Sequence, residues 1–229
     1  MSRKFDGVAF DLDGTLYPNY RFYLPLIPFI VREHRLLMAL GKARDILRSP
    51  RQESLQKNPG DTFYDIQARI MGELLRMDRQ IVKEKTESLI YRGWEPLFKT
   101  IKPYPELRET LQTLRSAGLK LGVLSDFPPE AKLANLNLNG YWDAVLCSER
   151  AGALKPDPAP FLELLKKLEI SADRLLYVGN SVAYDIIGAK NIGMKAALVS
   201  FPFGKYRLKT GNADFVFSNY RALCDYILD

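Results

Sequence analysis

The chain has 229 residues, 47% of them hydrophobic and 26% charged, and this composition excludes a disordered chain because enough apolar surface can be buried. No stretch of about 18 uncharged apolar residues occurs, so we predict no membrane span. The net charge of +6 comes from the stretch between Tyr17 and Lys102, where 16 basic residues stand against 10 acidic ones and the rest of the chain is balanced.

The two cysteines, Cys147 and Cys224, are too few for a disulfide framework, and we interpret them as buried thiols in a reducing compartment. The N-terminal residues contain no apolar segment that ends in a small-residue cleavage site. We therefore expect no secretory signal and a cytoplasmic protein. The sequence leaves both a monomer and a homodimer open.

In chain order, the predicted elements begin with a short buried strand that ends at Phe10 and meets a sharp turn at residues 11–15. From about residue 20 to residue 100 apolar residues recur at helical spacing, which predicts an all-helical insertion of about four helices. After Pro103, strands alternate with helices. The strands are expected at 119–124, 144–147, 175–178, 196–199 and 215–217, and the helices at 105–117, 128–139, 158–168, 182–191 and 219–228. This alternation predicts a parallel sheet with helices on both faces.

The basic excess of the inserted stretch has three interpretations. Solvated helix faces are the simplest, and a lid that attracts an anionic substrate is the functional alternative. Nucleic-acid binding is weaker, because the sequence has no zinc-finger spacing and no dense basic run. The aromatic and basic residues that open the stretch could contact a leaving group or pack at a hinge: Tyr17, Tyr20, Arg21, Phe22 and Tyr23.

Four short polar segments follow predicted strands. They are Asp11-Leu12-Asp13-Gly14-Thr15, Ser125-Asp126, Lys155-Pro156-Asp157-Pro158, and Gly179-Asn180-Ser181 with Asp185. Open parallel sheets bind ligands beyond the carboxyl ends of their strands. The four segments are therefore expected to meet at one crevice, although they lie far apart in the chain.

The first segment places two carboxylates, Asp11 and Asp13, directly after a buried strand. These groups repel each other, and burial increases that cost, so a hard divalent cation such as Mg²⁺ would resolve the conflict. A turn with solvated acids is the alternative for an isolated pair. Lys155, held between two prolines, could neutralise both a carboxylate and a phosphate oxygen. Alone it would be read as a surface lysine, and Ser125 alone as a helix N-cap.

Taken together, in this order, the four segments resemble the motifs of the haloacid dehalogenase superfamily. The resemblance covers residues 5–17 and about 103–217. It implies a doubly wound, Rossmann-like α/β core made of residues 1–16 and 103–229. The helical stretch 17–102 lies where this family inserts an all-helical cap domain after the first strand.

The resemblance also implies roles for the acidic residues. Asp11 would be the nucleophile that forms an aspartyl phosphate, and Asp13 would protonate the leaving oxygen and then deprotonate the attacking water. Mg²⁺ would be the cofactor, bound by Asp11, the carbonyl of Asp13 and the fourth motif with Asn180 and Asp185.

The phosphate-binding residues implied by the resemblance are Thr15, Ser125, Asp126 and Lys155. The Ser125 hydroxyl and the backbone N–H of Asp126 would hold phosphate oxygens, and Lys155 would balance the charge around the nucleophile. Transfer of a phosphoryl group depends on this positioning more than on further covalent chemistry.

Two positions discriminate within the family. Asp13 favours a phosphatase over a dehalogenase, because expulsion of halide needs no acid at that position. Asn180 departs from the pattern, since the family's phosphatases usually have an aspartate there that binds Mg²⁺. With one negative charge fewer, we expect an active enzyme that needs a high Mg²⁺ concentration.

The favoured function is Mg²⁺-dependent hydrolysis of a small phosphorylated metabolite, with no nucleic-acid or membrane partner. A phosphoryl-transferring mutase would share every motif and differ only in the acceptor. A non-catalytic protein that binds phosphate compounds is the alternative from a different class, and it is motivated by Asn180.

Overall fold

The computed structural model describes residues 3–49, 58, 60–200 and 212–229, and within them the strands form one six-stranded sheet. The strands are β1 (Gly7–Phe10), β2 (Lys120–Ser125), β3 (Ala144–Cys147), β4 (Leu175–Gly179), β5 (Lys195–Val199) and β6 (Phe215–Phe217). Their order is β3-β2-β1-β4-β5-β6, and every neighbouring pair is parallel. The predicted parallel α/β sheet is therefore confirmed.

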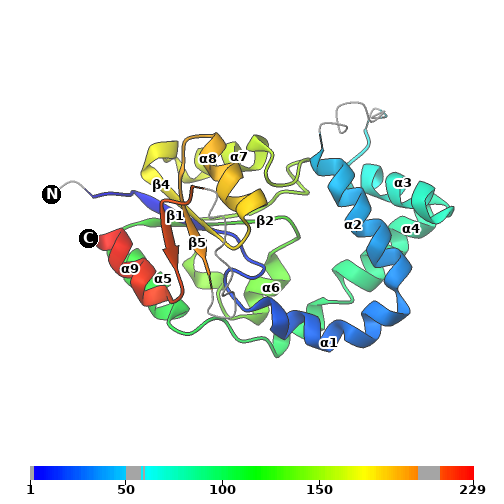
Figure 1. Ribbon diagram of the computed structural model, residues 1–229, viewed down its shortest axis with the longest axis horizontal. Coiled ribbons are helices and arrows are strands. Elements are labelled where there is room, and N and C mark those ends of the chain that lie inside the picture. The colour runs from blue at the N-terminus through cyan, green and yellow to red at the C-terminus, as the bar shows by residue number, and fades with distance from the viewer. Residues whose placement is uncertain (1–2, 50–57, 59, 201–211) are drawn as a thin grey trace.

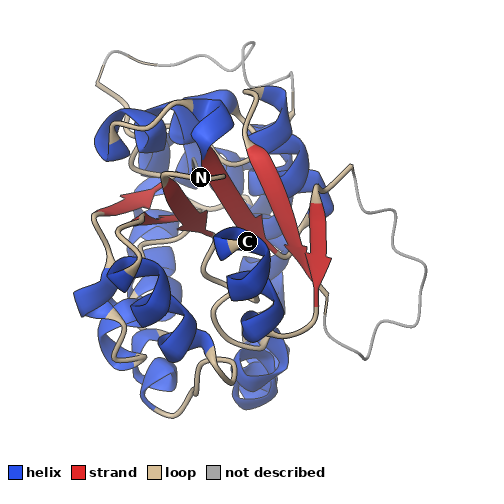
Figure 2. Ribbon diagram, turned by 90° about the vertical axis from the view of Figure 1, so that its left-hand side faces the viewer, coloured by secondary structure: helices blue, strands red, loops and turns tan. Residues whose placement is uncertain are grey.

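Two layers of helices cover the sheet (Figures 1 and 2). Because side chains alternate along a strand, Val8 and Phe10 of β1 pack into one hydrophobic cluster and Ala9 packs into the other. The first cluster includes side chains of α5 (Leu107–Ser116), α6 (Glu130–Asn135) and α9 (Tyr220–Leu228). The second includes side chains of α7 (Pro158–Leu168) and α8 (Ile187–Asn191). Because β1 lies between these layers, all of its residues are buried, and Asp11 follows directly at its carboxyl end.

The stretch between β1 and α5 is helical, as its apolar spacing predicts. Its elements are α1 (Asn19–Arg32), α2 (His34–Arg48), α3 (Phe63–Leu75), α4 (Arg79–Thr86), a π-helix (Glu87–Tyr91) and a 3-10 helix (Glu95–Lys99). We call residues 17–102 the helical insertion; its helices lie to one side of the sheet in Figure 1. The helices α2, α3 and α4 share a third hydrophobic cluster with Leu154 of the core, whereas Phe22 and Leu26 of α1 pack into the sheet-side cluster.

Several helix ends differ from the sequence expectation, for local reasons. The helix expected at 128–139 ends as α6 at Asn135, and Asn137 adopts a left-handed backbone with φ of 54°. The helix expected at 182–191 begins with a π-helix over Val182–Ile186 before α8. None of the helices in the described residues is long and apolar enough to cross a membrane.

Candidate active site

The carboxyl ends of β1, β2 and β4 bring three of the four motifs together. β1 pairs with β2 on one side and with β4 on the other, and the chain order of the strands reverses at this point. Such a switch point opens a crevice where ligands bind. Asp11 follows β1, Ser125 ends β2, and Asn180 follows β4.

Lys155, from the third motif, joins residues of the first and fourth motifs at this sheet edge. Its ammonium lies 2.7 Å from Asp11 Oδ1 and 2.6 Å from Asp185 Oδ1. It also donates to the hydroxyl of Tyr177 at 3.2 Å and to the carbonyl of Leu124 at 3.4 Å. The lysine is only 3% exposed, so these contacts replace its hydration.

Burial and the neighbouring charges shift the pKa values of Asp11 and Lys155 in opposite directions. Burial raises the pKa of Asp11 to about 7, although the Lys155 ammonium acts to lower it. Burial alone would lower the pKa of Lys155, but the Asp11 and Asp185 carboxylates outweigh it and hold that pKa well above its ordinary value. Lys155 is therefore a permanent cation, whereas Asp11 takes up a proton close to neutral pH.

The carboxylate of Asp13 lies outside that group and has two other partners. Tyr17 donates its hydroxyl to Asp13 Oδ1, and the ammonium of Lys132 lies 2.5 Å from Oδ2. Tyr17 is fully buried, while Tyr20 and Tyr23 are exposed. Of the aromatic residues that open the insertion, Tyr17 therefore touches a motif residue. Lys132 is not among the residues expected from the sequence, because nothing in its surroundings in the chain marks it.

Thr15 and Ser125 differ in what their hydroxyls do. Thr15 donates to Asp11 Oδ2 at 2.8 Å, so its hydroxyl orients the carboxylate. Ser125 is 1% exposed, and its Oγ has no hydrogen-bond partner within the described part of the chain. A buried hydroxyl without a partner is costly, and a ligand oxygen at this point would remove the cost.

The side chain of Asp126 connects the site to the helical insertion. Its Oδ1 accepts from the backbone N–H of Lys155 at 3.1 Å, and its Oδ2 lies 2.6 Å from Arg48 of α2. Burial would raise the pKa of Asp126, but Lys155, Arg44 and Arg48 outweigh it, and the pKa is lowered. Arg44 forms a buried ion pair with Glu149 as well. Two of the basic residues in the insertion thus pair with acidic residues of the core beside the site, an arrangement that differs from solvated helix faces.

The fourth motif lies directly against the first. Gly14 has a positive φ of 85°, and a Cβ built on it would lie 2.0 Å from Nδ2 of Asn180, so only glycine fits beside that amide. The carboxylate of Asp185 is fully engaged by the protein. Its Oδ1 pairs with Lys155, and its Oδ2 accepts from the backbone N–H groups of Asn180 at 3.1 Å and Ser181 at 3.0 Å.

These contacts determine how the site could hold Mg²⁺. No three His, Cys, Asp or Glu side chains of the described residues lie close enough together to bind a metal ion. Both oxygens of Asp11 and both oxygens of Asp185 already have protein partners. The oxygen donors that the motifs bring to this edge are the Asp11 and Asp185 carboxylates, the Asp13 carbonyl and the Asn180 amide. Mg²⁺ in phosphoryl-transfer sites is commonly held by one or two carboxylates plus substrate phosphate oxygens. The residues therefore fit Mg²⁺ in that mode.

A family model for haloacid dehalogenase-like hydrolases matches residues 5–193. The chain belongs to this family. A glyceraldehyde 3-phosphate phosphatase of Methanothermobacter thermautotrophicus is 36% identical over 85% of each chain. A phosphoglycolate phosphatase of Haemophilus influenzae is 27% identical over 97% of this chain and 98% of the relative. The crystal structure of a phosphatase of this family from Thermococcus onnurineus is 25% identical, with a TM-score of 0.64 and coverage of 96% of this chain and 97% of that one. The predictions of the family and of a phosphatase within it are confirmed.

Proposed function

We propose that this haloacid dehalogenase-like hydrolase cleaves a small phosphomonoester with Asp11 as the nucleophile and Mg²⁺ as the cofactor. One observation carries the proposal. Asp11 follows β1, and Ser125, whose hydroxyl has no partner among the described residues, ends the neighbouring parallel strand β2, with the Lys155 ammonium 2.7 Å from Asp11. A carboxylate, a hydroxyl donor and a fixed cation at one sheet edge are the groups that transfer of a phosphoryl group requires.

In the first step, the Asp11 carboxylate attacks phosphorus, the bond from phosphorus to the ester oxygen breaks, and an aspartyl phosphate forms. Asp13 gives its proton to the departing oxygen, and its contacts with Tyr17 and Lys132 hold the carboxyl group in place. In the second step, Asp13 takes a proton from water as the water oxygen attacks phosphorus. The bond from phosphorus to Asp11 then breaks, and inorganic phosphate is released.

The phosphate would be held by groups that lie at this edge of the sheet. The Ser125 hydroxyl and the backbone N–H of Asp126 would donate to its oxygens, and Lys155 would offset its charge beside Asp11. Mg²⁺ on Asp11, the Asp13 carbonyl and Asn180 would supply further positive charge, while Asp185 would fix the Asn180 loop through the two backbone N–H groups that it accepts.

The helical insertion would act as a cap over this crevice. We place the domain boundaries at 17 and 102, where the chain leaves and rejoins the core. Arg48 supports a closing role, because a residue of α2 contacts the loop that carries Ser125. Closure of this kind excludes water during the first step and favours a small substrate.

Hydrolysis of p-nitrophenyl phosphate across a series of Mg²⁺ concentrations tests the proposal. We expect nitrophenol release that requires Mg²⁺ and is lost in Asp11→Asn. Phosphorus NMR of the products separates hydrolysis, which gives inorganic phosphate, from a mutase, which gives an isomeric ester. Absence of release at every Mg²⁺ concentration, with phosphate binding retained in the wild type and in Asp11→Asn, would establish a non-catalytic binding protein instead.

A further inference from the structure

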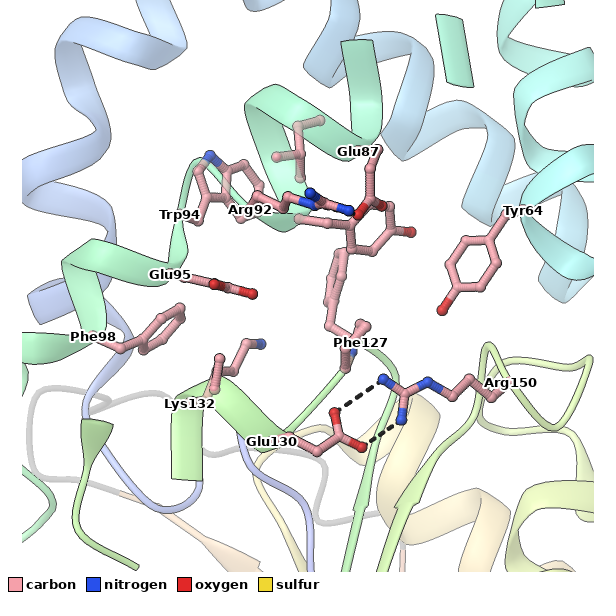
Figure 3. A pocket seen from close by; sticks show the side chains of 14 residues that line it. Tyr64, Glu87, Arg92, Trp94, Glu95, Phe98, Phe127, Glu130, Lys132 and Arg150 are labelled. Carbon is pink, nitrogen blue, oxygen red and sulfur yellow. Dashed lines mark hydrogen bonds and ion pairs between the residues drawn. The ribbon is translucent and has the colours of Figure 1, made fainter. Parts of the chain in front are cut away.

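A cavity of about 430 Å³ lies beside the crevice, between the helical insertion and α6. Residues that bound it include Tyr64, Trp94, Glu95, Phe98, Phe127 and Lys132 (Figure 3). We call it the Lys132 cavity. In the figure, Glu95 and Lys132 point into the opening from one side and Tyr64 from the other.

Lys132 joins this cavity to the chemistry. Its ammonium lies 2.5 Å from Asp13 Oδ2, 5.3 Å from the ring centre of Phe98 and 5.1 Å from that of Phe127. This step rests on the proposed function, in which Asp13 protonates the leaving oxygen. The alcohol portion of the substrate must then start beside Asp13, and Lys132, which contacts Asp13, is also part of the wall of the Lys132 cavity.

The size and the walls of the cavity indicate that the alcohol portion of the substrate contains a ring. Its volume falls within the range of about 300–1,000 Å³ that is typical of pockets for whole organic ligands, so a two- or three-carbon alcohol would leave most of it unfilled. The rings of Trp94, Phe98 and Phe127 contribute flat apolar surface, and aromatic faces pair best with another ring.

The charges of the cavity indicate that this ring is uncharged. Each cation in its wall already has a carboxylate partner: Lys132 pairs with Asp13, Arg92 with Glu87 at 2.9 Å, and Arg150 with Glu130. The side chain of Glu95 has no hydrogen bond or ion pair to any described residue and points into the cavity (Figure 3). A substrate carboxylate would meet the Glu95 carboxylate, which has no cation paired with it in the described part of the chain, whereas hydroxyl groups would donate to Glu95.

We propose that the substrates are phosphomonoesters whose alcohol carries a hydroxylated ring and no negative charge, with nucleoside monophosphates as the nearest common example. The ring would lie against Phe98 and Phe127, and its hydroxyls would donate to Glu95. Small acidic esters such as phosphoglycolate are disfavoured by the same residues.

Three probe substrates separate the two parts of this proposal: uridine 5′-monophosphate, glycerol 1-phosphate and 2-phosphoglycolate. We expect kcat/KM to fall at least about tenfold from the first to the second, when the ring is lost, and again from the second to the third, when a carboxylate is gained. A kcat/KM for phosphoglycolate equal to or above that for glycerol phosphate overturns the charge argument. A kcat/KM for uridine monophosphate equal to or below that for glycerol phosphate overturns the ring argument. Hydrolysis of p-nitrophenyl phosphate in the same preparation keeps both outcomes distinct from failure of the proposed function.

A charge reversal tests the role of Glu95 directly. In Glu95→Lys, the ratio of kcat/KM for phosphoglycolate to that for glycerol phosphate is expected to rise about tenfold, because the acidic alcohol gains a cation. Glu109→Lys, an exposed residue of α5 outside the cavity, changes the net charge equally and should leave the ratio unchanged. An unchanged ratio in Glu95→Lys, or an equal rise in both variants, overturns the assignment of Glu95. Each ratio is taken within one preparation, so partial misfolding of a variant cancels.

Discussion

Arg48 Nη2 lies 2.6 Å from Asp126 Oδ2, and Arg48 Nε donates to the backbone carbonyl of Lys155 at 3.0 Å. One side chain of α2 thus contacts two motif loops of the core. These contacts use two different nitrogens of a planar guanidinium, which a lysine ammonium cannot reproduce.

Arg48→Lys is therefore expected to lower kcat by about 100-fold with a smaller change in KM, because misplaced catalytic groups slow the chemical step. Arg35→Lys, an exposed position on the same helix, is the matched control and should retain wild-type kinetics. Steady-state kinetics on p-nitrophenyl phosphate give both constants. Wild-type kcat in Arg48→Lys would show that Arg48 does not position the core loops.

Asp11 and Asp185 both contact the Lys155 ammonium, but replacement of each by asparagine should have a different effect on the stability of the protein. Asp11→Asn should abolish hydrolysis with little loss of stability, because it removes a buried carboxylate whose pKa burial has raised, and Asp185 remains to pair with Lys155. Asp185→Asn also weakens two hydrogen bonds from backbone N–H groups, and should lower the free energy of unfolding by about 1–3 kcal/mol. Urea denaturation measures the difference, and equal stabilities would contradict this division of roles.

Asn180→Asp should reduce the Mg²⁺ concentration needed for half-maximal hydrolysis by about tenfold, because a second carboxylate strengthens a site for a hard cation. The side chains have nearly the same shape, so the packing against Gly14 is retained. Asn191→Asp, at an exposed position at the end of α8, adds the same charge elsewhere and should leave the Mg²⁺ requirement unchanged. If Asn180→Asp has no effect, residue 180 is not a metal ligand.

The pH profile should depend on Mg²⁺. Burial raises the pKa of Asp11 to about 7, and the protonated carboxyl cannot attack phosphorus, so kcat/KM should fall as the pH falls through about 7 at low Mg²⁺. A bound cation competes with the proton for the carboxylate, and the midpoint should therefore move to lower pH as the Mg²⁺ concentration rises. A midpoint that is independent of Mg²⁺ would argue against Asp11 as both ligand and nucleophile.

Cys147 should be unreactive in the folded protein. Both cysteines are free and buried, and burial raises the pKa of Cys147 to about 11. At pH 8 only about one thiol in a thousand would then be ionised, and the thiolate is the form that reacts. In a Cys224→Ser variant, dithionitrobenzoate should therefore label Cys147 only on addition of urea. Rapid labelling of the native variant would be inconsistent with this environment.

The sequence predicted those features of the site that depend on the fold. Residues that follow parallel strands must meet at one edge of the sheet, so the grouping of Asp11, Ser125 and Lys155 could be expected from the strand pattern and the resemblance. β3 and β6 and the helix α7 also lie where the apolar pattern places them.

Side-chain partners across long separations could not be predicted in the same way. Lys132 pairs with Asp13 across 119 positions, and Arg48 pairs with Asp126 across 78. Neither lysine nor arginine is unusual on a helix surface, and no periodicity distinguishes a paired cation from a solvated one. The engagement of Asp185 depends on the π-helix that begins at Val182, a backbone detail that apolar spacing does not specify.

Leu154, the residue before Lys155, is buried among the side chains of α2, α3 and α4 rather than in the core of the sheet. The lysine at the centre of the site is thus anchored, one residue away, in the interior of the helical insertion. A chimaera that replaced these helices with those of a relative would have to retain the apolar side chains that pack around Leu154. If Leu154 lost its packing partners in the chimaera, the Lys155 ammonium would move, and catalysis would change together with substrate specificity.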